Sequence, residues 1–148
     1  MVANMKELCS QIEIHASSER VWQILSDFKR FPQWNPFIRW AKGEAKTGAR
    51  LEVRIQPSGA NGMTFKLTVL KAEPNRELRW LARFLIPGLF DGEHIFSIDA
   101  LGAQHVHFTQ REIYTGWLVP LMARGLDTDT RRGFEKMNQA LKVLAEQT

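Results

Sequence analysis

The sequence has a single cysteine, no long apolar run and no block of positive charge, and each of these absences excludes a class of protein. Cys9 alone cannot form an intramolecular disulfide or a cysteine-rich zinc site, so we expect a reducing, cytoplasmic setting. The most apolar window, 80–90, contains Arg83 and is shorter than the about 18 residues of a membrane-spanning helix. The net charge is +4, but the basic residues are dispersed along the chain. We therefore predict no nucleic-acid binding and no stable membrane insertion.

Motifs for phosphate or metal binding are also missing. The glycine-containing stretch 58–62 lacks the pattern of a phosphate-binding loop and lies between two predicted strands, which is typical of a turn. His105 and His107 share one face of a predicted strand, but no third metal ligand accompanies them. We therefore predict neither a cofactor nor a bound metal ion.

The residues that are present indicate a globular domain with many aromatic side chains. A chain of 148 residues, 44% of them hydrophobic, is typical of one soluble domain, and we expect a single domain over residues 1–148. The chain contains five tryptophans and nine phenylalanines. Because each aromatic side chain buries about 150–250 Å², this inventory predicts either a large core or an apolar pocket that side chains fill only in part.

Hydrophobic periodicity predicts a strand, two short helices and then a series of strands. Residues 9–15 alternate between apolar and polar side chains, as expected for a half-buried strand. Residues 17–19, Ser-Ser-Glu, supply an N-cap and an acidic first turn for a helix whose apolar positions recur at helical spacing through Phe28. Asp27 can cap a second short helix. In the region 38–114, alternating runs separated by turn residues predict an antiparallel meander with one packed face.

After Gly116 the hydrophobic period changes to that of a long helix. We expect Asp127 or Thr128 to cap this helix. Thr130 and Gly133 interrupt its apolar stripe, which leaves either a gap for a ligand or a close approach to a strand. The predicted fold is α+β: a curved antiparallel sheet of about seven strands wrapped around a long C-terminal helix, with two short helices after the first strand.

Five segments of the sequence resemble one known family. They are residues 12–28, 31–37, 91–96, 109–112 and 132–142, and because they are spread between positions 12 and 142, the resemblance covers nearly the whole chain. The second segment carries the motif Phe-Pro-x-Trp-Asn-Pro-Phe and the third carries Asp-Gly-Glu-His-x-Phe. The resemblance is to the START-like helix-grip superfamily (SRPBCC), in its polyketide cyclase/dehydrase and lipid-transport-like branch. It implies a deep hydrophobic cavity between the sheet and the long helix that holds an apolar small molecule, but a shared fold does not transfer a reaction.

Strand parity places three polar side chains, those of His94, Gln110 and Glu112, toward one end of this inferred cavity. With a turn centred near Gly102, His94 would lie opposite Gln110, and Glu112 would lie one pleat further toward the mouth. His94 and Glu112 could act as an acid/base pair that enolises a carbonyl compound or drives ring closure with loss of water. They could also orient a bound ligand, or simply satisfy each other in a buried polar patch.

The inward-facing aromatic and aliphatic side chains are predicted to line the cavity. The complete predicted ligand-binding set is Trp40, Phe65, Leu67, Trp80, Phe84, His94, Phe96, Phe108, Gln110, Leu126, Thr130 and Phe134. Two apolar loops, 85–90 and 117–122, would form the mouth and gate access, pack on each other as a closed lid, or contact a partner.

We therefore expect this protein to bind a hydrophobic small molecule, lipid-like or aromatic polyketide-like, for transport or sequestration. One alternative is a cyclase/dehydratase-type enzyme that uses His94 and Glu112 as acid and base without a cofactor. Another is a protein-interaction module that uses the apolar loops, and the sequence also leaves a homodimer open.

Overall fold

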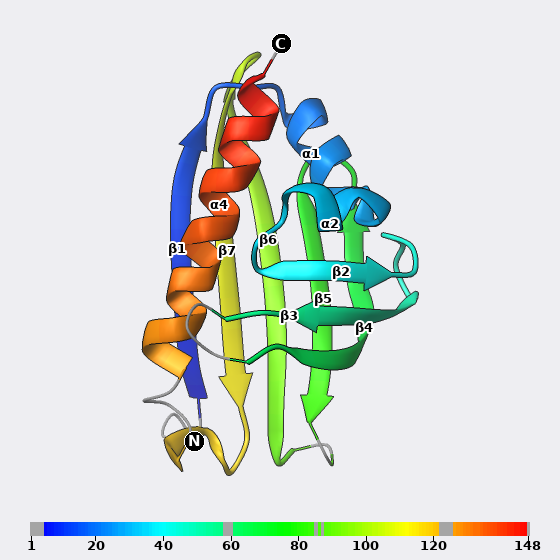
Figure 1. Ribbon diagram of the computed structural model, residues 1–148, viewed down its shortest axis with the longest axis vertical. Helices are drawn as coiled ribbons and strands as arrows, with labels where there is room; N and C mark the ends of the chain where they lie inside the picture. Colours follow the sequence, from blue (N-terminus) through cyan, green and yellow to red (C-terminus); the bar gives the residue numbers. More distant parts are fainter. Residues whose placement is uncertain (1–4, 58–60, 85, 87, 122–125, 148) are drawn as a thin grey trace.

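The computed structural model describes residues 5–57, 61–84, 86, 88–121 and 126–147 (Figure 1). The strands of this described part are β1 (Met5–Ile14), β2 (Ile38–Lys42), β3 (Arg50–Ile55), β4 (Met63–Glu73), β5 (Glu77–Phe84), β6 (Phe90–Gly102) and β7 (His105–Thr115). The helical segments are α1 (Ser18–Ser26), η2 (Phe28–Arg30), α2 (Phe31–Trp34), η3 (Leu126–Thr130) and α4 (Arg131–Glu146). None of the helices in these ranges is long and apolar enough to span a membrane.

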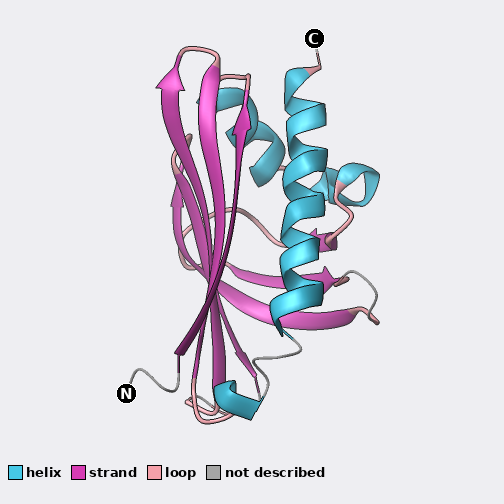
Figure 2. Ribbon diagram, turned by 90° about the vertical axis from the view of Figure 1, so that its left-hand side faces the viewer, coloured by secondary structure: helices cyan, strands magenta, loops and turns pink. Residues whose placement is uncertain are grey.

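The strands form one antiparallel sheet in the order β1-β7-β6-β5-β4-β3-β2. Figure 1 shows β1, β7, β6 and β5 running along the long axis of the molecule, whereas β2 and β3 cross it. In Figure 2, α4 lies along one face of the sheet, so the curved sheet and the helix enclose the core between them. This arrangement confirms the predicted α+β helix-grip fold.

Polar contacts hold α4 against β1, the strand at one edge of the sheet. Arg131 donates a hydrogen bond to the Cys9 carbonyl at 3.0 Å, and Lys142 donates to the Glu13 carbonyl at 2.8 Å. These two contacts lie near opposite ends of α4 and therefore set its direction along the strand. The apolar stripe of the helix is then buried over the sheet, as predicted.

The long helix begins differently from the prediction. Leu126–Thr130 form a π-helical turn that continues directly into α4 at Arg131. Thr130 occupies the N-cap position with helical backbone angles and makes no capping side-chain hydrogen bond. The prediction of a cap at Asp127 or Thr128 is therefore wrong, because the chain is already helical at both positions.

Gly133 accommodates a close approach between α4 and the segment that precedes β2. A Cβ at this position would lie 2.2 Å from Cδ1 of Phe37, which is far too close for two carbon atoms that are not bonded to each other. The Phe37 ring packs edge-on against Phe134, with the ring centroids 5.4 Å apart. Of the two interpretations of this glycine, the structure therefore shows the close approach, and the neighbour is an aromatic ring.

Side-chain hydrogen bonds fix both ends of the helical region after β1. The Ser17 side chain accepts from the Arg20 amide at 3.1 Å, which confirms the predicted cap of α1. The Asn35 side chain is fully buried, and its Oδ1 accepts from the amides of Phe37 and Ile38 at 3.0 and 2.8 Å. Asn35 thus locks the helical corner onto the start of β2.

Candidate functional site

β6 and β7 bring the three predicted polar residues together, but in a different register from the predicted one. His94 pairs with Glu112 and Phe96 pairs with Gln110, so each partner lies two residues further along β7 than predicted. The turn residues between the strands are 103–104, which moves the centre of the turn by one position and the register by two. A shift of two leaves every side chain on its face of the sheet, so the predicted clustering is confirmed although the pairing is wrong.

A continuous chain of polar contacts runs from Glu112 through the interior to Ser10. His94 Nδ1 lies 2.8 Å from Glu112 Oε2, and His94 Nε2 lies 2.9 Å from Gln110 Oε1. Gln110 Nε2 donates to Asn138 Oδ1 at 2.7 Å, and Asn138 Nδ2 donates to Ser10 Oγ at 3.1 Å. We call these five residues the polar network, which joins β7, β6, α4 and β1.

The polar network is buried among aromatic rings. Gln110 is 0% exposed and His94 is 4% exposed. The imidazole of His94 stacks on Phe96 at a centroid distance of 4.2 Å, with Phe134 at 5.1 Å and Trp80 at 5.8 Å. In such a low-dielectric setting each polar contact is strengthened, and each unsatisfied polar group becomes costly.

The polar network also determines the tautomer of His94. The Phe134 carbonyl oxygen only accepts hydrogen bonds and lies 3.4 Å from the Gln110 amide nitrogen, so this nitrogen points to α4 and the Gln110 oxygen points to His94. An amide oxygen only accepts hydrogen bonds, and therefore Nε2 of His94 carries a hydrogen. Nδ1 then faces the Glu112 carboxyl group at 2.8 Å, where two lone pairs would repel each other. The two atoms therefore form a place where a proton can lie, on Nδ1 or on Oε2.

Glu112 Oε2 is buried and has no partner in hydrogen-bonding geometry among the described residues. Its 2.8 Å approach to His94 Nδ1 is within ion-pair distance but lacks the alignment of a hydrogen bond. The Glu112 side chain is 12% exposed, compared with 5% for His94, so this end of the polar network lies nearer to solvent. The arrangement can therefore accept a hydrogen bond from a bound hydroxyl group and can exchange a proton with it.

Tyr114 lies beyond Glu112 on the same face of β7. It is 5% exposed and stacks on Phe90 at a centroid distance of 5.4 Å. Burial raises the pKa of the Tyr114 phenol well above its ordinary value, the negative charge of Glu112 raises it further, and a hydrogen bond with Thr130 opposes both effects. The phenol therefore stays protonated and can act only as a neutral hydrogen-bonding group.

Sequence reasoning missed three contributors to this site, namely Ser10, Tyr114 and Asn138. Asn138 could have been found, because it is a polar residue on the buried stripe of α4 between Phe134 and Leu141. Tyr114 follows Glu112 at the strand period of two, which also predicts the shared face. Ser10 carries no such signal, since it lies near the middle of an edge strand whose partner on α4 depends on how the helix packs.

Most of the predicted ligand-binding side chains pack against one another on the inner face of the sheet. Trp80 contacts Phe96 edge-on at a centroid distance of 5.1 Å, and Phe96 stacks near Phe108 at 6.4 Å. Leu67 is buried in the core. Phe65 is partly exposed and packs against the core. The predicted side chains that lie outside the described part of the structure are those of Phe84 and Leu126.

Trp40 does not face the interior as predicted. A register irregularity between Ile38 and Trp40 inserts one residue into the alternation of β2, so Ala41 rather than Trp40 points into the core. Trp40 lies opposite Arg54 and beneath the Lys42 ammonium group, which is 4.9 Å from the ring centroid. It therefore belongs to the outer face of the sheet.

The two apolar loops are joined to each other and expose large side chains. The Leu118 amide donates to the Leu89 carbonyl at 3.1 Å. Ile86 is 62% exposed, Trp117 is 78% exposed and Leu121 is 82% exposed. The loop residues that lie outside the described part of the chain are Leu85, Pro87 and Met122. The hydrogen bond between the loops fits the interpretation that they pack on each other as a closed lid. Their exposed apolar side chains fit the interpretation that they contact a partner. That the loops gate access to the interior stays a prediction.

Comparisons with known proteins agree on the fold. The chain is similar to a START superfamily protein from Mycobacterium smegmatis, with 24% identity, a TM-score of 0.73, and 95% of this chain and 97% of that chain covered. It is similar to the Zhui aromatase/cyclase from Streptomyces sp. R1128, with 17% identity, a TM-score of 0.74, and 96% and 94% covered. It is also similar to truncated norcoclaurine synthase from Thalictrum flavum, with 15% identity, a TM-score of 0.73, and 97% and 96% covered.

These solved structures share the fold with this chain. Because their sequences are less than 25% identical to it, they show nothing about its function. A search of curated protein sequences finds no match. The family model described as polyketide cyclase/dehydrase and lipid transport matches residues 5–142. The chain therefore belongs to the polyketide cyclase/dehydrase and lipid transport family and has a START-type helix-grip fold.

Proposed function

We propose that this protein binds a hydrophobic small molecule, lipid-like or aromatic polyketide-like, between the sheet and α4. The apolar body of the ligand lies against the rings of Trp80, Phe96 and Phe134, and a hydroxyl group of the ligand donates to Glu112. Because these rings pack closely around the polar network, a ligand has to separate them, and its own apolar body must replace the contacts that are lost.

The buried oxygen Oε2 of Glu112 is the observation that carries this proposal. A buried acceptor without an aligned donor costs about 1–3 kcal/mol, so such atoms call for an explanation. A ligand hydroxyl on Oε2 would recover this cost. A few convergent polar groups at one end of an apolar interior are also typical of small-molecule sites.

Native mass spectrometry of the purified protein tests the proposal, together with extraction of any co-purified compound and thermal denaturation in the presence of a lipid and polyketide panel. We expect a stoichiometric apolar compound, or a gain in melting temperature with one class of the panel. A clean mass of the chain together with no gain across the panel would contradict the proposal.

A pair of matched tryptophan variants locates the bound compound. Trp80→Phe changes a 4% exposed ring of the inner face, whereas Trp117→Phe makes the same change at a 78% exposed ring. We expect Trp80→Phe to weaken binding about threefold or more, because it removes buried apolar contact area, and Trp117→Phe to leave the affinity unchanged. Equal affinities for both variants would place the ligand elsewhere.

We also propose a second function, acid/base catalysis on the bound compound, which rests on the 2.8 Å approach of His94 Nδ1 to Glu112 Oε2, where a proton can pass between the two groups. A group within hydrogen-bonding distance of a carbonyl compound that can both give and take a proton can enolise it or assist ring closure with loss of water. Pure binding does not require this proton to move.

Deuterium incorporation separates catalysis from binding. The extracted compound is incubated in deuterated buffer with the wild type, with Glu112→Gln, and with Glu135→Gln as a control on the exposed face of α4. If the pair is catalytic, the wild type and Glu135→Gln incorporate deuterium next to the carbonyl group. Glu112→Gln then fails to do so while it keeps its affinity for the compound within a few-fold. Binding without incorporation by the wild type would refute catalysis and leave the binding function intact.

A further inference from the structure

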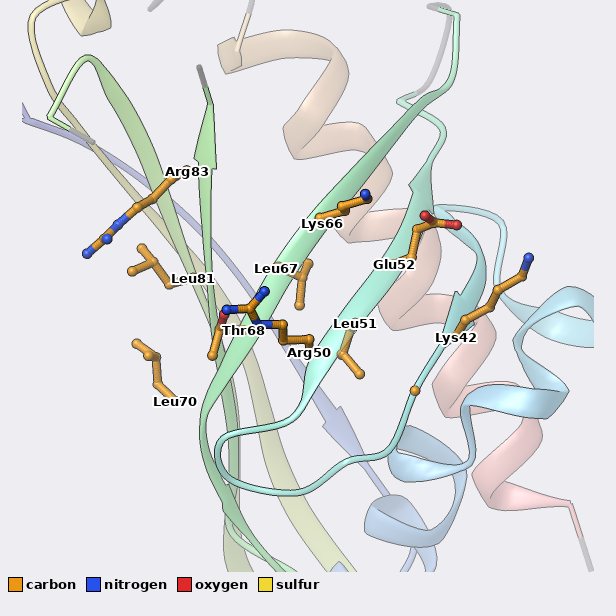
Figure 3. Close-up of a pocket in the computed structure, with 11 residues that line it drawn as sticks. Lys42, Arg50, Leu51, Glu52, Lys66, Leu67, Thr68, Leu70, Leu81 and Arg83 are labelled. Carbon is orange, nitrogen blue, oxygen red and sulfur yellow. The ribbon is translucent and has the colours of Figure 1, made fainter. Parts of the chain in front are cut away.

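A groove of about 710 Å³ lies on the face of the sheet opposite to α4, over β3 and β4 (Figure 3). Most of its lining side chains are not buried, such as those of Arg50 and Glu52, whereas the buried Leu51 and Leu67 also contribute to the lining. No member of the polar network lines the groove, and neither does any of the three rings of the proposed binding site, so the groove is a separate site. Its volume lies within the range of about 300–1,000 Å³ that small-molecule sites occupy.

Positive charge dominates the groove. Lys42, Arg50, Lys66 and Arg83 line it, together with a single carboxylate, that of Glu52. The register places Glu52 between Lys42 and Lys66. Figure 3 shows this trio at one end of the groove and Arg83 at the other, with Arg50 between them. The Arg50–Arg83 end is thus cationic and lacks a lining carboxylate.

The groove cations differ from a neighbouring cation of the same sheet face. Arg79 pairs with Glu93 at 3.3 Å, so the carboxylate that lies beside the groove on β6 is already neutralised. Within the described part of the chain, the side chains of Arg50, Lys66 and Arg83 form no ion pair or hydrogen bond. Their charges are therefore available to an external anion.

Asp91 is the carboxylate that the register places opposite Arg83. Its Oδ2 accepts a hydrogen bond from the Gly88 amide at 3.3 Å, and its Oδ1 is buried. Asp91 is therefore engaged with its own turn, and the cationic character of this end of the groove remains.

Apolar side chains lie beside these cations. Leu70 is 39% exposed and Leu81 is partly buried, and Figure 3 shows both near Arg83, on the side of the groove toward β5. Large aliphatic side chains on the outer face of a strand indicate a surface that an apolar group can cover. An arginine guanidinium offers the planar, forked donor set that matches carboxylate and phosphate oxygens.

We propose that the outer groove is a second binding site, which takes a small amphipathic anion: a carboxylate or phosphate monoester with an apolar tail. The head group lies on Arg50 and the neighbouring cations, and the tail covers Leu70 and Leu81. The site is independent of the function proposed for the interior, because the two lie on opposite faces of the sheet.

Chemical-shift perturbation of the backbone amides tests this site, with decanoate and decyl phosphate as probes and decyltrimethylammonium as the control of opposite charge. We expect both anions to shift the amides of β3 and β4. The double variant Arg50→Gln/Lys66→Gln should lose affinity at least about fivefold. Arg76→Gln/Arg132→Gln removes the same net charge at exposed positions outside the groove, and it should bind as the wild type does.

Three outcomes would overturn the second site. Equal losses in the two double variants would reflect net charge alone, and equal affinity for the cationic probe would show that charge does not select the ligand. Shifts centred on His94 and Gln110 that change in Glu112→Gln would place the anions in the interior, which would support the function proposed there while excluding the groove. Because the four side chains that they replace are exposed, both double variants should fold.

Discussion

Replacing Gln110 with leucine tests whether the polar network stabilises the fold through mutual satisfaction of its members. Gln110 is 0% exposed, and its side chain lies 2.9 Å from His94 Nε2, 2.7 Å from Asn138 Oδ1 and 3.4 Å from the Phe134 carbonyl oxygen. Leucine has a similar volume but no polar atom. Gln110→Leu therefore leaves a buried imidazole N–H group and a buried amide oxygen without partners.

The expected loss follows from these two orphaned groups. Each costs about 1–3 kcal/mol, and burial of the leucine methyl groups offsets about 1–2 kcal/mol of their sum. We expect the free energy of unfolding to fall by about 3 kcal/mol in Gln110→Leu. Asn138→Leu should lose about 1–3 kcal/mol, because the Gln110 amide nitrogen keeps only its 3.4 Å contact with the Phe134 carbonyl.

The double variant decides between a coupled network and independent contacts. Once both amides are leucine, fewer orphaned groups remain than the two single variants create, so the double variant should lose about 1–2 kcal/mol less than their sum. Urea denaturation followed by tryptophan fluorescence measures all four proteins, and Gln139→Leu, an exposed neighbour on α4, controls for helix propensity. Additivity within about 0.5 kcal/mol would refute the reasoning.

Thermal denaturation of three single variants tests other parts of the structure. Gly133→Ala should lose about 1–3 kcal/mol although alanine favours helices, because its Cβ would lie 2.2 Å from Cδ1 of Phe37; a higher melting temperature would contradict this close approach. Asn35→Ala should lose about 2–3 kcal/mol, since two buried backbone amides lose their acceptor, and an unchanged melting temperature would show that they find another. A hydrogen bond from Lys142 lowers the pKa of Glu146, so Glu146 adds stability above the ordinary glutamate pKa and loses it as the pH falls through the lowered value. Glu146→Gln should therefore be less stable than the wild type at neutral pH and equal to it at strongly acidic pH, and a gap that does not depend on pH would be inconsistent with this linkage.

The hairpin of β6 and β7 shows which part of the site could be predicted. Alternation places His94, Gln110 and Glu112 on the inner face, because successive side chains of a strand point to opposite sides. The same alternation cannot distinguish pairing of His94 with Gln110 from pairing with Glu112, since a register shift of two preserves the faces. The pairing partner of His94 depends on the position of the two-residue turn at 103–104. The hydrophobic pattern does not change when this turn moves by one residue.

Trp40 shows that one inserted residue in a strand makes the alternation of inner and outer side chains predict the wrong face. The inserted residue between Ile38 and Trp40 reverses the faces of β2, so an aromatic residue expected on the inner face lies on the outer one. The start of α4 is a comparable case, because the π-helical turn at Leu126–Thr130 takes the place of a capped helix end. Such irregularities arise from packing against other elements and leave little trace in local composition.

The sequence by itself determined the order of the elements, the inner and outer faces of most strands, and membership of the family, because these depend on periodicities and motifs within short segments. Only the tertiary structure decided that Ser10 and Asn138 extend the polar network, that Phe37 fills the space at Gly133, and that unpaired cations gather over β3 and β4. Each of these arises from contacts between elements far apart in the chain. Such contacts depend on strand register and on how α4 packs on the sheet, neither of which a local pattern specifies.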